Sequence, residues 1–196
     1  MLEQFVGEQQ KQLLKISEGV PPVPPKADGT LEKMESFGDS SLPIEKEWPQ
    51  RDYLRQIPTD KRVKLNGISF KKYGNDNALT GFQLEFTNDV KTDLFETEFS
   101  RKSCKLERVA VDHTKTIRTV RVFVPNHASK HLNKLQMVDD SGHKVVDVTW
   151  TTGDDNDGDW ISQEIPHGRE IIGFYCNTSK DGTFILRLGF ILWTPH

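Results

Sequence analysis

The densest group of side chains that could bind a ligand is an acidic run at residues 153–160, Gly-Asp-Asp-Asn-Asp-Gly-Asp-Trp. Clustered carboxylates suit a hard cation or a basic partner, and an exposed indole can stack on a sugar ring or anchor a protein contact. The candidate ligand-binding residues of this run are Asp154, Asp155, Asp157, Asp159 and Trp160.

A calcium site is one interpretation of the acidic run. Counted against the twelve-residue calcium loop, Asp155, Asp157 and Glu164 fall at the third, fifth and twelfth positions. Gly153 stands at the first position, which calls for an acid, and the flanking residues predict strands where helices are needed. Three interpretations therefore stay open: a calcium site with Asp155, Asp157 and Glu164 as ligands, a solvated hairpin loop, and an acidic surface for a basic partner.

The rest of the sequence offers no catalytic candidates. No nucleophile elbow, phosphate loop or dinucleotide-binding fingerprint occurs, and neither Cys104 nor Cys176 lies in a recognisable nucleophile context. The six histidines show no spacing that would place two of them on one zinc ion. We therefore predict a protein that is not an enzyme and that has no cofactor, apart from the calcium considered above.

Bulk composition limits the partners. The 196 residues carry 26 lysines and arginines against 29 aspartates and glutamates, so no general basic field attracts nucleic acid or an anionic membrane. The sequence contains neither a secretory signal nor an apolar stretch of membrane-spanning length. We expect an intracellular protein, cytoplasmic or associated with the cytoskeleton, whose two cysteines are free thiols.

The first 60 residues differ in pattern from the remainder. Residues 1–18 carry an apolar stripe at helical spacing, which predicts a short amphipathic helix that packs on its own domain, docks on a partner or lacks fixed structure. Residues 19–60 follow as a proline-containing extended arm that opens with Pro-Pro-Val-Pro-Pro-Lys at 21–26. The candidate partner-binding residues of these two segments are Leu2, Phe5, Val6, Leu13, Pro21, Pro24 and Trp48.

Residues 61–196 have the pattern of an all-β domain with a threefold repeat. Each repeat consists of an alternating apolar strand, a polar loop and a second alternating strand. The three first strands begin at Leu65, Ile117 and Ile171. Because no such sheet can bury its apolar face alone, we expect the three sheets to turn those faces toward a common axis.

This repeat, together with the closing segments 168–174 and 182–190, resembles the jacalin-related β-prism domains. The resemblance covers roughly residues 62–195. It implies a β-prism of three four-stranded, antiparallel, Greek-key-like sheets around a pseudo-threefold axis. It also implies that loops at one end of the prism are the place where a sugar would bind.

One motif of that family is altered here. Members commonly carry a closing Gly-x-x-x-Asp pattern, whose aspartate accepts hydrogen bonds from sugar hydroxyls. Gly182 matches the glycine, but Leu186 stands at the position of the aspartate. Arg187 beside it is a hydrogen-bond donor and cannot accept a hydroxyl proton. We therefore expect the usual sugar site to be lost or rebuilt, with Gly182 and Arg187 as its remaining candidate residues.

These observations predict a non-catalytic binding or scaffold protein, a β-prism tied into a larger protein assembly through its N-terminal arm. Such an arm loses conformational entropy when it becomes ordered, which only contact with a partner or with its own domain offsets. The alternative is an intracellular carbohydrate-binding lectin with remodelled end loops, assisted by calcium if the acidic run binds it.

Overall fold

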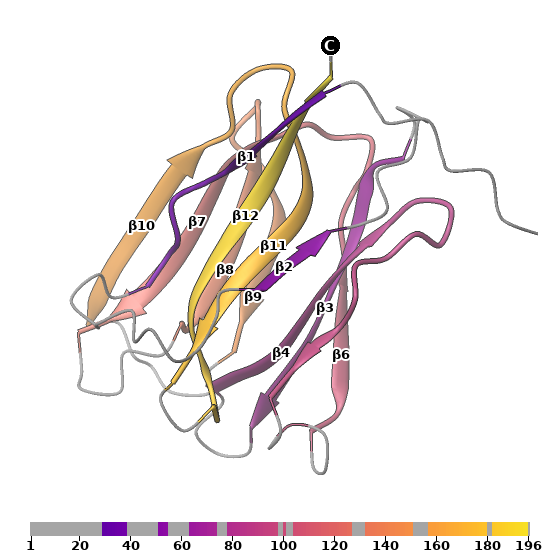
Figure 1. Ribbon diagram of the computed structural model, residues 1–196. Coiled ribbons are helices and arrows are strands. Elements are labelled where there is room, and N and C mark those ends of the chain that lie inside the picture. The colour runs from indigo at the N-terminus through magenta and orange to yellow at the C-terminus, as the bar shows by residue number, and fades with distance from the viewer. Residues whose placement is uncertain are drawn as a thin grey trace, which may run out of the picture.

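The computed structural model of the chain describes residues 29–38, 63–73, 78–97, 100, 104–126, 132–150, 157–179 and 182–195, and the backbone of 51–54. Within these residues every named element is a β-strand, and the strands form three four-stranded antiparallel sheets (Figure 1). The described part of the chain contains no helix long and apolar enough to cross a membrane. The helix predicted at residues 1–18 lies outside the described residues.

The first sheet has the strand order β5-β4-β3-β6. Its strands are β3 (Leu65–Tyr73), β4 (Ala78–Phe86), β5 (Phe95–Glu96) and β6 (Leu106–Ala110). The hairpin β3–β4 is the first of the predicted repeats, and β6 returns to pair with β3. This order is that of a Greek key, as predicted.

The outer face of the first sheet holds a buried carboxylate. Glu85 accepts hydrogen bonds from the Nε of Arg108 at 2.6 Å and from the hydroxyl of Ser69. Burial by itself raises the pKa of Glu85, but these hydrogen bonds and the nearby charge of Lys91 outweigh it, so its pKa lies below the ordinary value. The carboxylate is saturated by structural partners, so it contributes to the stability of the sheet.

The second sheet repeats the same order, β10-β7-β8-β9. Its strands are β7 (Ile117–Pro125), β8 (Lys134–Asp139), β9 (Lys144–Thr149) and β10 (Gly158–Glu164). The hairpin β7–β8 is the second predicted repeat, and β10 returns to pair with β7. The alternation seen in the sequence therefore gives two sheets of the same topology.

The third sheet is assembled from both ends of the chain, in the order β1-β12-β11-β2. Its strands are β1 (Gly29–Lys33), β2 (Arg51–Leu54), β11 (Glu170–Thr178) and β12 (Ile185–Pro195). The hairpin β11–β12 is the third predicted repeat, and each of its edges is completed by one strand from the N-terminal half.

Two segments of the predicted extended arm at residues 19–60 therefore form β1 and β2 and belong to the same sheet as strands of the domain predicted at residues 61–196. The physical reason is that β1 pairs with β12 and β2 pairs with β11, so these two segments supply the outer strands of the third sheet. Beyond β1, the backbone of Phe37 pairs with that of Leu188, and the Phe37 side chain is 0% exposed. This part of the predicted arm belongs to the core.

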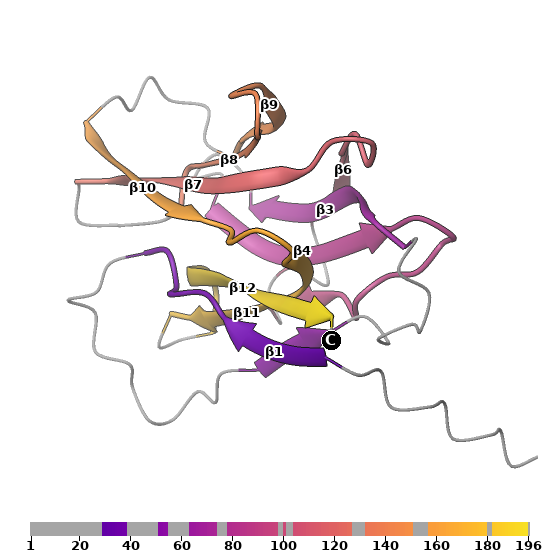
Figure 2. The same ribbon diagram turned by 90° about the horizontal axis from the view of Figure 1, so that it is seen from above.

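The three sheets lie around a common centre (Figure 2). Their buried apolar residues form one core. The ring of Phe82 in the first sheet lies 4.9 Å from that of Phe174 and 6.3 Å from that of Phe190, both in the third sheet. The second sheet contributes Val120 and Leu135, which are fully buried. The threefold repeat in the sequence thus reflects three faces that pack against each other, as in a three-sided prism.

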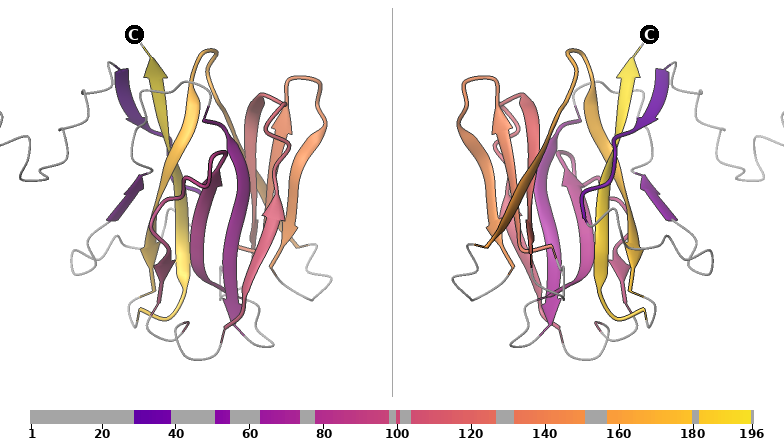
Figure 3. Two further views of the ribbon diagram at one scale, coloured as in Figure 1. Left: turned by 90° about the vertical axis from the view of Figure 1, so that its right-hand side faces the viewer. Right: turned by 90° about the vertical axis from the view of Figure 1, so that its left-hand side faces the viewer.

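The prism has two distinct ends. We call the end where β3, β7 and β11 begin and β12 finishes the C-terminal pole, and the opposite end the hairpin pole (Figure 3). Gly29 pairs with Pro195, so β1 begins at the C-terminal pole beside the last described residues (Figure 1). The β11–β12 turn and the start of β10 lie at the hairpin pole.

Candidate functional site

Gly182 lies in the turn between β11 and β12, the place where the resemblance locates a sugar site. Its φ of 69° is left-handed, which a glycine adopts without strain, and its N–H donates to the Ser179 carbonyl at 2.8 Å. The Ser179 hydroxyl accepts hydrogen bonds from the backbone N–H groups of Thr183 and Phe184 at 3.1 and 3.0 Å. Gly182 therefore has a structural role in shaping this turn.

The residues after this turn are packed against the chain's own N-terminal segment. Leu186 is half-buried and Arg187 is only 9% exposed. Gly38 lies against both, since a Cβ added there would be 2.4 Å from the Leu186 carbonyl oxygen and 3.0 Å from the Arg187 Cγ. The described segment that ends at Gly38 therefore covers the start of β12, and the loss of the family's aspartate at Leu186 stays a prediction.

The described end of the acidic run is fixed to the neighbouring strand. Asp157 accepts a hydrogen bond from the Nδ2 of Asn126 at 3.1 Å, and the Asn126 N–H donates to the Asp157 carbonyl at 3.0 Å. Asp159 is exposed on β10. Asp154 and Asp155 lie outside the described residues. Asp157 and Asp159 therefore present carboxylates at the hairpin pole, and a role for either in binding a ligand stays a prediction.

The structure contradicts one member of the predicted calcium set. Glu164 ends β10, whereas Asp157 directly precedes its first residue. An extended strand rises by about 3.3 Å per residue, so the two carboxylates are roughly 20 Å apart along the strand. Asp157 and Glu164 therefore cannot bind the same ion, because calcium needs its ligands within about 2.6 Å. The comparison with the twelve-residue calcium loop assumed a compact loop, but Gly158–Glu164 forms a strand.

Trp160 forms part of an aromatic and basic cluster on the outer face of the second sheet, which we call the Trp160 cluster: Trp160, Phe123, Arg121 and Lys134. The rings of Trp160 and Phe123 meet edge to face at 5.5 Å. The guanidinium of Arg121 lies over the indole at 5.1 Å, and the ammonium of Lys134 lies 5.1 Å from the centre of the Phe123 ring. The half-buried indole is thus held in place, with one face covered by a cation.

Known proteins resemble this chain in structure rather than in sequence. No family model matches the sequence, and no curated protein matches it. Solved structures do match: single-chain recombinant jacalin, with a TM-score of 0.54 and 11% identity, is aligned over 83% of this chain and 94% of its own. The domain is a jacalin-like β-prism. At this level of identity the likeness establishes the fold alone.

Two further solved structures cover nearly the whole length of the neighbour. A Malaysian banana lectin matches the β-prism with a TM-score of 0.52 and 12% identity, over 85% of this chain and 99% of the lectin. A prostate-specific WGA16 glycoprotein lectin matches with a TM-score of 0.51 and 12% identity, over 85% and 100%. Both of these neighbours are named as lectins, and the likeness to them again shows the fold.

The β-prism brings only some of the predicted site residues together. Gly182, Asp157 and Asp159 lie toward the hairpin pole, while Glu164 lies at the C-terminal pole. The candidate residues of the arm, from Leu2 to Trp48, lie outside the described residues. In the described part, no group of three or more histidine, cysteine, aspartate or glutamate side chains is placed to hold a metal ion.

Sequence reasoning missed the contributions of Arg121 and Gly38 to these surfaces. Arg121 is recognisable once β7 and β10 are paired, because its position is opposite Ser162, two residues after Trp160. Gly38 had no such signal, because it follows a short edge strand whose partner residues are 158 to 166 positions away in sequence.

Proposed function

We propose that this chain is a non-catalytic binding module, a jacalin-like β-prism held in a larger protein assembly by residues 1–28. The observation that carries the proposal is the way β1 is anchored. Its five residues pair antiparallel with β12, from Gly29 opposite Pro195 to Lys33 opposite Ile191. The apolar stripe and the proline segment come directly before this strand in sequence, so they are joined to a rigid edge of the prism at its C-terminal pole.

Additional contacts make β1 a firm attachment point. Arg169, which follows β10, forms an ion pair with Glu32 of β1. The Nε2 of Gln163 in β10 donates to the Glu35 carbonyl at 2.8 Å, which links the segment to the second sheet as well. A force or a binding event on residues 1–28 is therefore transmitted to two of the three sheets.

The character of the candidate sites favours a protein partner over a sugar. A sugar hydroxyl needs acceptors, and Leu186 removes the carboxylate that would supply them. A sugar ring also stacks on a bare aromatic face, whereas Arg121 already covers one face of Trp160. The Trp160 cluster, with a fixed aromatic residue and two cations, has the composition of a protein contact, in which tryptophan and arginine are enriched.

The proposal is tested by expressing three forms with a C-terminal tag in cells of the protein's source. These are the full chain, a chain that starts at residue 29, and a full chain with Leu2, Phe5, Val6 and Leu13 replaced by alanine. The truncation stops at residue 28 because β1 begins at Gly29. We expect the full chain to elute in a high-mass complex with a constant set of proteins. The other two forms should elute at the mass of the isolated domain.

Circular dichroism and thermal melting of the same three forms provide the control, since all should retain the folded β-prism. If the folded chain that starts at residue 29 still elutes in the high-mass complex, residues 1–28 are not the tether. If the full chain itself elutes alone, the assembly function is wrong.

The second candidate function is that of a carbohydrate-binding lectin. The observation in its favour is the fold, because its structural neighbours include the artocarpin-mannotriose complex and a mannose-binding lectin from Champedak. A glycan array with and without millimolar calcium separates the two functions. Reproducible binding to a sugar class that is lost on replacement of residues at the hairpin pole would favour the lectin, and a blank array would favour the protein assembly.

A further inference from the structure

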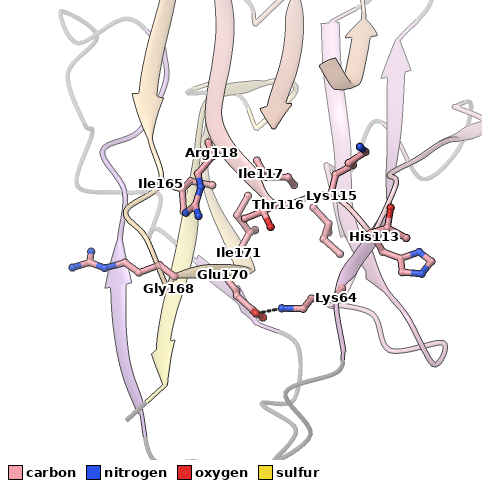
Figure 4. Close-up of a pocket in the computed structure, with 13 residues that line it drawn as sticks. Lys64, His113, Lys115, Thr116, Ile117, Arg118, Ile165, Gly168, Glu170 and Ile171 are labelled. Atoms are coloured by element: carbon pink, nitrogen blue, oxygen red, sulfur yellow. Dashed lines mark hydrogen bonds and ion pairs between the residues drawn. The ribbon is translucent and has the colours of Figure 1, made fainter. Parts of the chain in front are cut away.

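A pocket of about 340 Å³ opens at the C-terminal pole, at the far end of the prism from the β11–β12 turn (Figure 4). Three segments line it: the start of β3, the turn and first residues of β7, and the turn between β10 and β11. All three sheets of the prism therefore contribute to it. Its volume lies at the lower end of the range for small-molecule sites, which is about 300–1,000 Å³.

Arg118 is the unusual residue of this pocket. The pairing of β7 with β8 shifts register between Ile117 and Thr119, so Arg118 is the extra residue of a β-bulge. Bulges redirect a side chain, and here Arg118 has the strand parity of Val120, which lies in the core. Its guanidinium accordingly lies among the residues that line the pocket, beside Ile165 (Figure 4).

The guanidinium of Arg118 has no polar partner among the described residues. Its Nε and Nη1 atoms are sealed from solvent and make no hydrogen bond. A buried donor without a partner is destabilising, and more so when it is charged, so native proteins rarely keep one without a reason. Nη2 is not among the sealed atoms, which leaves it as the nitrogen that a molecule in the pocket can reach.

The surrounding charges do not neutralise Arg118. Two other cations of the pocket have their own acids: Lys64 pairs with Glu170, as the dashed line in Figure 4 marks, and Arg169 pairs with Glu32. Lys115 adds a further exposed positive charge to the lining. This charge helps to lower the pKa of Asp112 and of Asp139. The residues that line the pocket thus include four lysines and arginines and one acid, Glu170, although the chain as a whole has a net charge of -3.

The floor of the pocket is apolar. Its aliphatic lining residues are Leu65, Ile117, Ile165 and Ile171. A bare inorganic ion would leave this surface without a partner, whereas a molecule with both a carbon framework and a negative group would contact the floor and the guanidinium at once.

We propose that this pocket binds a small organic anion, with a carboxylate or phosphoryl oxygen accepting a hydrogen bond from Arg118 and the rest of the ligand lying on the aliphatic floor. Both groups are planar or tetrahedral oxyanions that arginine binds well. The site is distinct from the hairpin pole and does not depend on residues 1–28 as a tether. It gives the β-prism a ligand at the end opposite to the one where the resemblance placed a sugar.

The test measures the melting temperature of the full chain against increasing glucose 6-phosphate and glucuronate, at constant ionic strength kept with sodium chloride. Glucose serves as the uncharged match for both. A ligand that binds only the native state raises its apparent stability with concentration. We expect saturable shifts with one or both anions and none with glucose. The anion with the stronger shift identifies the preferred oxyanion.

Three variants connect the shift to this pocket. Arg118→Met keeps the length of the side chain and removes the charge, so it should raise the dissociation constant at least tenfold. Nε and Nη1 of Arg118 make no hydrogen bond that the substitution could remove. Without an anion, this variant should therefore have a melting temperature equal to or above that of the unaltered chain. Lys115→Gln is the second variant. Because the Lys115 side chain is exposed, its replacement should leave the fold intact and weaken binding by a smaller factor than Arg118→Met.

Lys105→Gln is the matched control. It removes one positive charge from an exposed residue just before β6, at the strand end that pairs with Lys71 and lies away from the pocket. It should bind as the unaltered chain does. The proposal is overturned if neither anion shifts the melting temperature, if glucose shifts it equally, or if Arg118→Met and Lys115→Gln both bind like Lys105→Gln.

Discussion

Replacing Phe37 with alanine tests whether the N-terminal segment is part of the domain. Phe37 is 0% exposed, and its ring lies 6.4 Å from that of Phe190 in an edge-to-face contact. Its backbone N–H donates to the Leu188 carbonyl at 2.7 Å, and its own carbonyl accepts from the Leu188 N–H at 3.1 Å. The substitution leaves these backbone hydrogen bonds in place, so it removes the side chain from the core and little else.

The expected loss follows from this burial. Truncating a fully buried phenylalanine to alanine costs about 3–5 kcal/mol, because the transfer energy of the ring is lost and a cavity is left behind. For a protein of this size each kcal/mol corresponds to about 2–4 °C, so the melting temperature should fall by about 6–20 °C. The loss is comparable with a large part of the stability of an ordinary domain.

Urea denaturation followed by tryptophan fluorescence measures the free energy of unfolding, with Leu31→Ala as the matched control. Leu31 lies in β1 but is 44% exposed, so its replacement should change the free energy by no more than about 0.5 kcal/mol. The slope m should be the same for all three proteins. A Phe37→Ala loss below about 1 kcal/mol, or one equal to that of Leu31→Ala, would refute the placement of this segment in the core.

Three further predictions concern single groups. Glu85→Gln should lower stability by about 1–2 kcal/mol at pH 7, since hydrogen bonds to a charged group are lost. The folded-state pKa of Glu85 is depressed, so its contribution is present above the unfolded pKa; in urea titrations the difference from the unaltered chain should shrink below about pH 4. Burial raises the pKa of Cys176 to about 12, so a thiol reagent at pH 8 should modify this thiol only after unfolding, whereas half-buried Cys104 should react in the native state. If calcium raises the melting temperature, Glu164→Gln should leave the shift unchanged, because Glu164 lies at the far end of β10 from Asp157.

The three hairpins could be predicted from the sequence because their signal is local. In the first strands, apolar residues alternate with polar ones, and one face must turn inward. The residues that alternate in this way, such as Ile68 and Phe70, Val120 and Val122, and Phe174, are indeed buried in the common core. Local alternation was therefore enough to fix the positions of β3, β7 and β11 and their partners.

The two strands of the third sheet that precede residue 61 could not be predicted in the same way. β1 is an edge strand whose residues are mostly exposed, so it shows no apolar alternation. Its partner β12 is at the other end of the chain. One signal was available: the third repeat supplies only two strands, β11 and β12, and a third four-stranded sheet needs two more. Phe37 is an isolated aromatic residue in a polar segment, and it was the residue that could have indicated contact between this segment and the core.

The candidate sites were harder to predict because they depend on how strand ends meet. The sequence spacing of Asp157 and Glu164 matches that of a calcium loop. In the structure, the Trp-Ile-Ser-Gln segment between these two residues is part of a strand and separates their carboxylates. The position of Arg118 was informative but was overlooked. Arg118 is two residues before Val120 in β7, and Val120 and Val122 of this strand face the core. The pocket around it is formed by three segments that are far apart in sequence, and no local pattern predicts that they meet.

The most direct test of the proposed function asks whether residues 1–28 are sufficient to carry an unrelated protein into the assembly. These residues would be fused to the N-terminus of a stable, unrelated domain and expressed in cells of the protein's source. The account predicts that the fusion elutes with the same high-mass set of proteins as the full chain. A fusion that elutes alone, while the chain that starts at residue 29 retains those proteins, would contradict it.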